Sequence, residues 1–318
     1  MKFLALLAVL LIEQMRPLRQ GNPLHAGFVR FAQYLRQMLD AGQYRQGVMA
    51  WFAAVAPLTL LVFAGEWLLA RANGPLALVF SVGVLYITVG FRKFSYFFNE
   101  INNLLKSGEV AAAREPLRRW RNADYGELDA SEVSRVTIEL GLMSSHRNVF
   151  GPMAWFIVLG PAGALLYRMA LALQEQWRAP TVPQPGAAEA SAEFALFAVR
   201  AFEIIDWLPA RLTAASFAIA GNFQDAVDCW RTQASAWGNP ADKLDGAEGI
   251  ILASGAGALG VKLGGTLHES GSERQRPELG SGDDADTDYL SSAVGLIWRA
   301  LVMWMLLIAV VTIAHSVG

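Results

Sequence analysis

The chain has 318 residues, of which 54% are hydrophobic and only 17% are charged. Soluble domains usually carry about 25% charged residues, so this composition favours a membrane protein. The net charge of −2 gives no general attraction to nucleic acid, and the single cysteine, Cys229, excludes an internal disulfide. The four histidines are too scattered along the chain to predict a metal site.

The first 47 residues predict a retained apolar helix followed by an amphipathic one. Residues 3–12 form a short apolar run, but no small-residue cleavage site of a signal peptide follows it. Between residues 14 and 47, large apolar side chains recur at three- and four-residue steps, which is typical of a surface helix. Arginines outnumber acidic residues there, and this excess assigns the segment to the cytoplasmic side of a membrane.

Two apolar runs, residues 48–69 and 76–91, follow in the sequence and are long enough to be membrane segments. The short connection between them contains Gly74 and Pro75, which favour a tight turn. Together they predict a transmembrane hairpin with its turn on the far side of the membrane.

The polar segment 92–148 predicts short helices on the cytoplasmic side. Asp129 and Glu132 have the spacing of a helix-capping box, so a helix is expected to begin between them. The basic stretch 114–121 is typical of a surface that faces lipid headgroups.

Two further apolar stretches contain residues that interrupt a membrane helix. Residues 150–173 are broken at Gly160 and Pro161, and residues 194–220 predict a helix, a kink at Pro209 and a second helical piece. Arg168 either reaches the far interface or points inward at an anionic group. Asp206 and Arg211 either form a structural pair across the break or serve function.

Residues 293–314 predict a terminal span, so the fold expected is an all-α, polytopic transmembrane bundle with about five or six membrane segments and broken helices. We expect a single domain: amino-terminal helices and a cytoplasmic loop in 1–148, a core in 149–292, and the last helix in 293–318. The positions of the basic loops place the chain in a bacterial inner membrane with residues 221–292 in the cytoplasm.

Five glycines and one lysine, Lys262, stand among small apolar residues between Gly255 and Gly265, and Arg276-Pro-Glu278 follows. Glycines let backbone amides approach a ligand, and the charged residues could receive a phosphate or an acidic substrate. A helix packed closely through small residues is the alternative interpretation. The spacing matches neither a P-loop nor a dinucleotide fingerprint, so both interpretations stay open.

Four stretches in this order resemble the CobD/CbiB family of cobalamin-biosynthesis membrane proteins: residues 160–168, 206–214, 257–265 and 276–280. The resemblance implies an adenosylcobinamide-phosphate synthase, which joins the carboxylate of adenosylcobyric acid to an aminopropanol or its phosphate and uses ATP and Mg²⁺. Activation of a carboxylate needs cations against phosphate charge. On the matched stretches, the candidate catalytic residues are Lys262, Arg276 and Glu278. The candidate substrate-binding residues are Arg168, Asp206, Arg211, Asn222, Gly257, Gly260, Gly264 and Gly265; no metal ligand is assigned.

The sequence also departs from the family pattern. Residues 143–149 contain His146 and Arg147 where the family has an acidic, amide-rich run, so a metal or amine site there would be lost or inverted. The amino-terminal third is similar to AmpE, a membrane relative associated with β-lactamase regulation. An AmpE-like, non-catalytic regulator is therefore the alternative function, and a transporter with broken helices is a third. Corrinoid, amino alcohol and lipid bilayer are the partners expected of the synthase.

Overall fold

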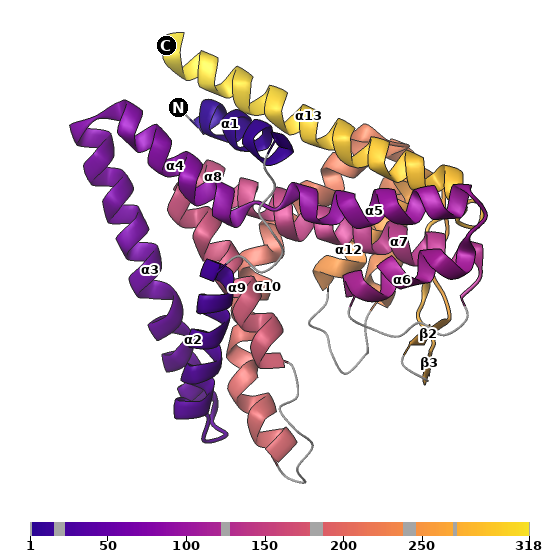
Figure 1. Cartoon of the computed structure of the whole chain (residues 1–318), viewed down its shortest axis with the longest axis horizontal. Helices are drawn as coiled ribbons and strands as arrows, with labels where there is room; N and C mark the ends of the chain where they lie inside the picture. Colours follow the sequence, from indigo (N-terminus) through magenta and orange to yellow (C-terminus); the bar gives the residue numbers. More distant parts are fainter. Residues whose placement is uncertain are drawn as a thin grey trace. The chain divides into compact units, whose positions relative to one another are not determined.

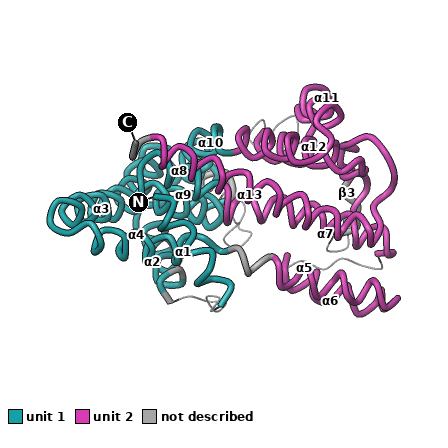
Figure 2. Tube along the Cα trace, turned by 90° about the horizontal axis from the view of Figure 1, so that it is seen from above, with its two compact units in different colours: residues 1–90, 151–209 teal, residues 91–150, 210–318 magenta. Residues whose placement is uncertain are grey.

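The computed structural model describes residues 2–15, 23–121, 128–178, 187–237, 246–269 and 272–317. These residues are mainly helical (Figure 1), and they divide into two compact units, each built from two separate parts of the chain (Figure 2). The division of the chain at residues 148 and 292, expected from the sequence, stays a prediction.

Unit 1 contains residues 1–90 and 151–209 and is built from helices. A core of large aromatic side chains joins them: Trp177 packs against Phe194 at 4.9 Å between ring centroids, and its indole N–H donates to the Ala32 carbonyl at 3.1 Å. The helices are α1 (Lys2–Met15), α2 (Pro23–Leu39), α3 (Tyr44–Ala72), α4 (Gly74–Thr88), α8 (Gly151–Leu159), α9 (Pro161–Arg178) and the first part of α10 (Ala187–Ala220).

The turn between α3 and α4 confirms the two helices and the tight turn of the predicted hairpin, whereas its crossing of a membrane stays a prediction. One residue, Asn73, separates the two helices, and its side-chain oxygen accepts the Leu76 N–H at 3.4 Å. Pro75 stands in the first turn of α4, where its missing N–H costs no helical hydrogen bond.

The break at Gly160, between α8 and α9, is also confirmed, and charged side chains lie at both helix ends. Lys2 donates to the Ile157 carbonyl at the carboxyl end of α8, at 2.7 Å. Glu66 lies beside Gly160, where a Cβ atom would come 2.6 Å from its Oε2. A cation at a carboxyl end and an anion at an amino end are the favourable arrangement for the helix dipole.

Residues 194–220 do not break into two helical pieces, as the sequence predicted: α10 continues through Pro209. Proline has no N–H, so it leaves the carbonyl of residue 205 without its helical partner. The indole N–H of Trp155 donates to that Ile205 carbonyl at 2.9 Å. The hydrogen bond from α8 therefore satisfies the group that Pro209 frees, and the helix can continue.

We predict that Trp155→Phe lowers the free energy of unfolding by about 1–3 kcal/mol, because the Ile205 carbonyl then has no donor. In a Pro209→Ala background, the restored backbone N–H of residue 209 can donate to the Ile205 carbonyl. Trp155→Phe should then lower the free energy of unfolding by clearly less. Denaturant unfolding in detergent micelles measures this free energy for the purified wild type, the two single variants and the double variant. An equal cost in both backgrounds would show that Trp155 acts through packing alone.

Unit 2 contains residues 91–150 and 210–318. The capping box expected at the start of α7 is confirmed: Asp129 accepts the Glu132 N–H at 2.8 Å, and Glu132 accepts the Asp129 N–H at 3.0 Å. The elements of this unit are α5 (Phe91–Lys106), α6 (Val110–Arg121), α7 (Ala130–Ser145), the π-helix η1 (His146–Phe150), the end of α10, α11 (Phe223–Gln233), the 3-10 helix η2 (Ala234–Ala236), α12 (Gly246–Leu259), the strands β1 (Leu263–Gly264), β2 (Leu267–Glu269), β3 (Ser272–Arg274) and β4 (Glu278–Leu279), and α13 (Thr287–Val317).

The four short strands were not expected from the sequence. Strand β1 pairs antiparallel with β4, and β2 with β3, so that residues 263–279 fold back on themselves. The hydrophobic pattern there has neither helical nor strand period, and the strands are only two or three residues long, so the sequence carries almost no signal for them. The all-α prediction holds for the helical part and misses this hairpin, which we call the glycine hairpin (residues 260–283).

Among the described residues, two helices are long and apolar enough to cross a membrane, α3 and α13. Only 28% and 33% of their most apolar stretches are buried within the protein, whereas a core helix of a soluble protein would be mostly buried. Large apolar side chains on both are exposed, among them Leu61 at 67% and Leu307 at 65%. These features fit a membrane protein; α4 and α12 are shorter apolar helices, and the number of five or six spans stays a prediction.

Candidate functional site

The first half of the glycine-rich stretch is the end of a buried helix. Gly255 and Gly257 lie in α12, where a Cβ atom at Gly255 would come 2.6 Å from the Leu142 side chain of α7. A Cβ atom at Gly257 would overlap the backbone of α11 at Asp225. The interpretation as a helix packed through small residues is therefore right for these two glycines.

The second half leaves the helix and forms the glycine hairpin. Gly260, Gly264 and Gly265 have φ angles of 68°, 80° and 71°, which favour glycine over any other residue. Strand β1 then pairs Gly264 with Glu278 of β4. The glycines thus allow the chain to turn, so that Glu278 returns to pair with Gly264, and Arg276 contacts the carbonyls of Gly264 and Gly265.

A charged pair fastens the glycine hairpin to α7. Glu139 of α7 receives Arg276 Nη1 at 2.6 Å on Oε2 and Arg276 Nη2 at 3.2 Å on Oε1, and Oε1 also accepts the Gly264 N–H at 2.8 Å. The side chains of Arg276 and Glu139 are only 13% and 8% exposed. A bidentate, nearly buried pair of this kind holds one fixed geometry.

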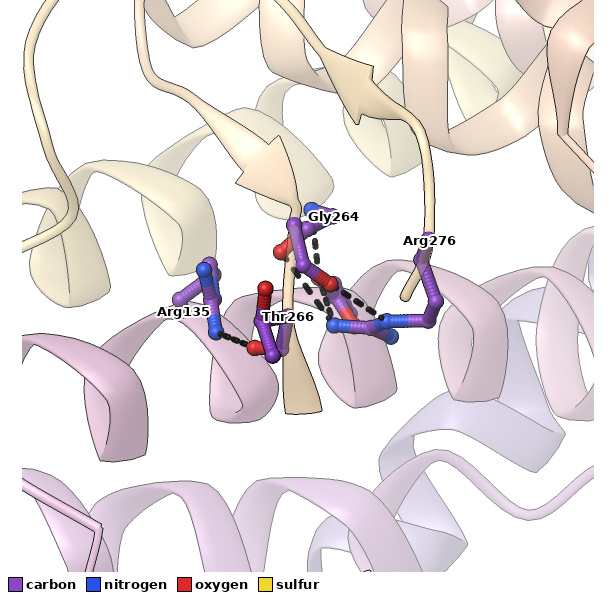
Figure 3. Close-up of polar contacts among 6 residues, drawn as sticks. Arg135, Gly264, Thr266 and Arg276 are labelled. Carbon is purple, nitrogen blue, oxygen red and sulfur yellow. Dashed lines mark hydrogen bonds and ion pairs between the residues drawn. The ribbon is translucent and has the colours of Figure 1, made fainter. Parts of the chain in front are cut away.

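The remaining donors of Arg276 also serve the glycine hairpin. Its Nε donates to the Gly265 carbonyl and its Nη2 to the Gly264 carbonyl, both at 3.3 Å (Figure 3). Its guanidinium lies 5.3 Å from the centre of the Trp237 ring. Arg276 therefore positions the hairpin, and its donors are already engaged by protein groups.

Lys262 and Glu278 are exposed charges of the hairpin. The Lys262 side chain is 48% exposed and lies 3.8 Å from the 83% exposed carboxylate of Asp284, so this pair is loose and solvated. Glu278 is exposed on β4, directly across from Gly264. Both side chains are free to meet a substrate, and the locked Arg276 fixes the backbone that carries them.

Comparison with known proteins shows the family to which the chain belongs. The family model described as CobD/Cbib protein matches residues 4–297, nearly the whole chain. The chain belongs to the CobD/CbiB family. It is 33% identical over 313 residues to the Cobalamin biosynthesis protein CobD of Stutzerimonas stutzeri, covering 96% of each chain, and 35% identical over 259 residues to that of Chromobacterium violaceum, covering 81% of this chain and 77% of the other. No solved structure matches.

Of the four other polar CobD/CbiB residues singled out in the sequence, Asn222 serves structure. Asn222 caps α11, because its side-chain oxygen accepts the Asp225 N–H at 3.3 Å. Arg211 belongs to the part of α10 in unit 2. Arg168 and Asp206 belong to unit 1, where Asp206 is buried and accepts the Tyr167 hydroxyl at 2.9 Å. Binding of substrate by these residues stays a prediction.

Two residues of α7 that the sequence analysis did not select contact the hairpin, Arg135 and Glu139. Their spacing of four residues puts both side chains on one face of the helix. The available signal was that these two charges stand on either side of Val136 and Ile138, which are buried. From the sequence alone, Arg135 could pair with Glu139 or with Glu132 along the same helix, so only the fold shows that Arg135 and Glu139 contact the hairpin.

The segment in which this CobD/CbiB chain departs from its family, residues 143–149, contains the end of α7 and most of the π-helix η1. His146 begins the π-helix η1, is fully buried, and lies 2.9 Å from the Thr213 hydroxyl through Nδ1. A π-helical turn is rare and often accompanies a functional site. In the described part of the chain, no group of three or more His, Cys, Asp or Glu side chains is placed to hold a metal ion.

Cys229, the single cysteine, lies in α11 and is buried. Burial raises the pKa of its thiol, and Asp225 and Asp228 raise it further, while the Ser281 hydroxyl acts in the opposite direction. The thiol therefore stays protonated at neutral pH and is not a candidate nucleophile.

Proposed function

We propose that this chain acts in cobalamin biosynthesis as a ligase of the adenosylcobinamide-phosphate synthase type. It would join the carboxylate of adenosylcobyric acid to the amine of an aminopropanol or its phosphate, with ATP consumed. The observation that carries the proposal is the glycine hairpin, which the Glu139–Arg276 pair fastens to α7 and in which exposed Lys262 precedes β1 and exposed Glu278 lies on the paired strand β4. The names of the relatives support the pathway, since each is a cobalamin biosynthesis protein.

The chemistry needs an activated carboxylate, because a free carboxylate does not react with an amine. Transfer of the terminal phosphoryl group of ATP to a carboxylate oxygen would give an acyl phosphate and ADP. The amine nitrogen then attacks the carbonyl carbon, the C–O bond to phosphate breaks, and the amine loses a proton. In this scheme Lys262 offsets phosphate charge and Glu278 accepts the proton from the amine.

The Mg²⁺ that the family implies would arrive with the phosphates. Mg²⁺ commonly binds one or two carboxylates together with substrate phosphates. Glu278 on the glycine hairpin and Asp284 directly after it are exposed carboxylates, so their oxygen ligands fit this ion. The bound ion would offset charge on the phosphoryl group during transfer.

The proposed orientation places the glycine hairpin on the cytoplasmic side of a bacterial inner membrane. The hairpin ends at Asp283, four residues before α13 begins at Thr287. If α13 crosses the membrane, the hairpin therefore lies close to one surface of it, within reach of soluble ATP.

Complementation tests the function. We expect the chain to restore cobalamin-dependent growth on cobyric acid to a bacterial host without its own synthase. Lys262→Ala and Glu278→Ala should each lower synthase activity by about 100-fold or more, because each removes a charge that acts on the reacting groups. The controls are Lys106→Ala and Glu115→Ala, exposed residues of unit 2 that should retain full growth.

Two results would contradict the proposal. Growth that is unchanged in both Lys262→Ala and Glu278→Ala would exclude the hairpin as the site. No growth with the wild-type chain, shown to be folded in the membrane, would favour the AmpE-like regulator instead. The departure at residues 143–149 would then be the physical reason.

A further inference from the structure

Arg135 of α7 carries a positive charge that the described protein groups do not neutralise. Its Nη2 donates to the Thr266 carbonyl at 2.6 Å, which fixes the guanidinium against the glycine hairpin (Figure 3). Its Nε is buried and has no hydrogen-bond partner. Among the side chains that the structure describes, no carboxylate forms an ion pair with it.

Arg276, which lies in the same hairpin, differs from Arg135 because protein groups satisfy its charge. Its charge is matched by Glu139 in a bidentate pair, and its remaining donors reach the carbonyls of Gly264 and Gly265. Arg135 is held by a single neutral carbonyl and keeps donors to spare. A half-buried arginine with unused donors is an arrangement that an anion would complete, because buried donors are normally satisfied.

The free side of Arg135 faces Gly265. A Cβ atom at Gly265 would lie 2.8 Å from Arg135 Nη1 and 4.0 Å from Glu278 Cγ, so the two side chains flank the same point on the hairpin. Gly265 has no side chain to fill that point, and its φ of 71° turns the backbone there. A cation and a carboxylate thus stand on either side of a residue with no side chain.

We infer that Arg135 binds the phosphate group of a substrate beside Gly265. The fork of a guanidinium matches the oxygens of a phosphate, which a lysine cannot reproduce. This inference deepens the proposed function, on which it rests for the identity of the substrate. Two substrates of that reaction would carry such a group, ATP and a phosphorylated amino alcohol; Glu278 would lie near the Mg²⁺ of the first or the amine of the second.

Isothermal titration of the purified full-length chain in lipid nanodiscs tests the inference with three probes: MgATP, O-phosphoethanolamine and ethanolamine. We expect Arg135→Gln to weaken binding of at least one phosphate probe by about 10- to 100-fold, and to leave ethanolamine unchanged. Arg135→Lys should fall in between. The control is Arg119→Gln, which removes the same charge from an exposed arginine of α6 and should bind all probes as the wild type does.

The probe that responds identifies the source of the phosphate. A loss confined to MgATP assigns Arg135 to the nucleotide, and a loss confined to O-phosphoethanolamine assigns it to the amino alcohol. Equal affinity of wild type and Arg135→Gln for both phosphate probes would overturn the inference, as would a wild-type chain that binds neither. Because these are binding measurements, a chain that fails complementation but loses phosphate binding in Arg135→Gln would keep this site and lose only the proposed reaction.

Discussion

Removing either partner of the Glu139–Arg276 pair should lower the free energy of unfolding by about 3–5 kcal/mol, because the other charge is left nearly buried without compensation. Arg276→Met leaves the Glu139 carboxylate with only the Gly264 N–H as a described partner. Glu139→Met leaves the guanidinium with carbonyl acceptors alone. Both variants should also fail to complement, since the glycine hairpin loses its attachment to α7.

The double variant Glu139→Met/Arg276→Met separates the pair from its neighbours. Its cost should be clearly smaller than the sum of the two single costs, because no uncompensated charge remains. Denaturant unfolding in detergent micelles measures the cycle. Arg119→Met is the matched control: its pair with Glu100 is 2.9 Å long but its side chain is 50% exposed, so it should cost less than about 1 kcal/mol. Additive costs in the buried pair would show that the two residues act independently.

The helices were predictable because their signals are local. The α3–α4 turn follows from Gly74 and Pro75 beside two apolar runs, and the start of α7 follows from the capping box of Asp129 and Glu132. The break predicted at Pro209 was wrong, and the reason is a tertiary contact. The Trp155 indole satisfies the carbonyl that the proline frees, and no property of residues 194–220 alone indicates such a donor.

The site was predictable only in part, because half of it comes from another part of the chain. The glycines, Lys262, Arg276 and Glu278 stand together in a recognisable motif. Their anchor, Glu139, and the free cation, Arg135, come from a helix more than a hundred residues earlier. The sequence grouped Arg276 with the candidate catalytic residues, and its contact with Glu139, which positions the hairpin, becomes visible only in the fold.

Alanine substitutions at two glycines of the hairpin should also have large effects on stability, and these effects should differ because the surroundings of the two glycines differ. Gly260 and Gly264 both have positive φ, at 68° and 80°. Nothing lies within 4 Å of a Cβ atom at Gly260, whereas at Gly264 it would overlap the Pro277 carbonyl and come 3.0 Å from the Trp237 ring. An alanine therefore meets only backbone strain at the first position, but strain and a backbone clash at the second.

Gly260→Ala should thus cost about 1–2 kcal/mol in the free energy of unfolding, the usual cost of a left-handed alanine. Gly264→Ala should cost about 3 kcal/mol or more, because Pro277 cannot move without separating β1 from β4. The same pairing holds Glu278 across from Gly264, so complementation should be lost in Gly264→Ala and kept in Gly260→Ala. Unfolding in detergent micelles and growth on cobyric acid give the two readouts. Equal costs at the two glycines would mean that φ alone decides, and that the close approach of β1 and β4 does not hold the hairpin together.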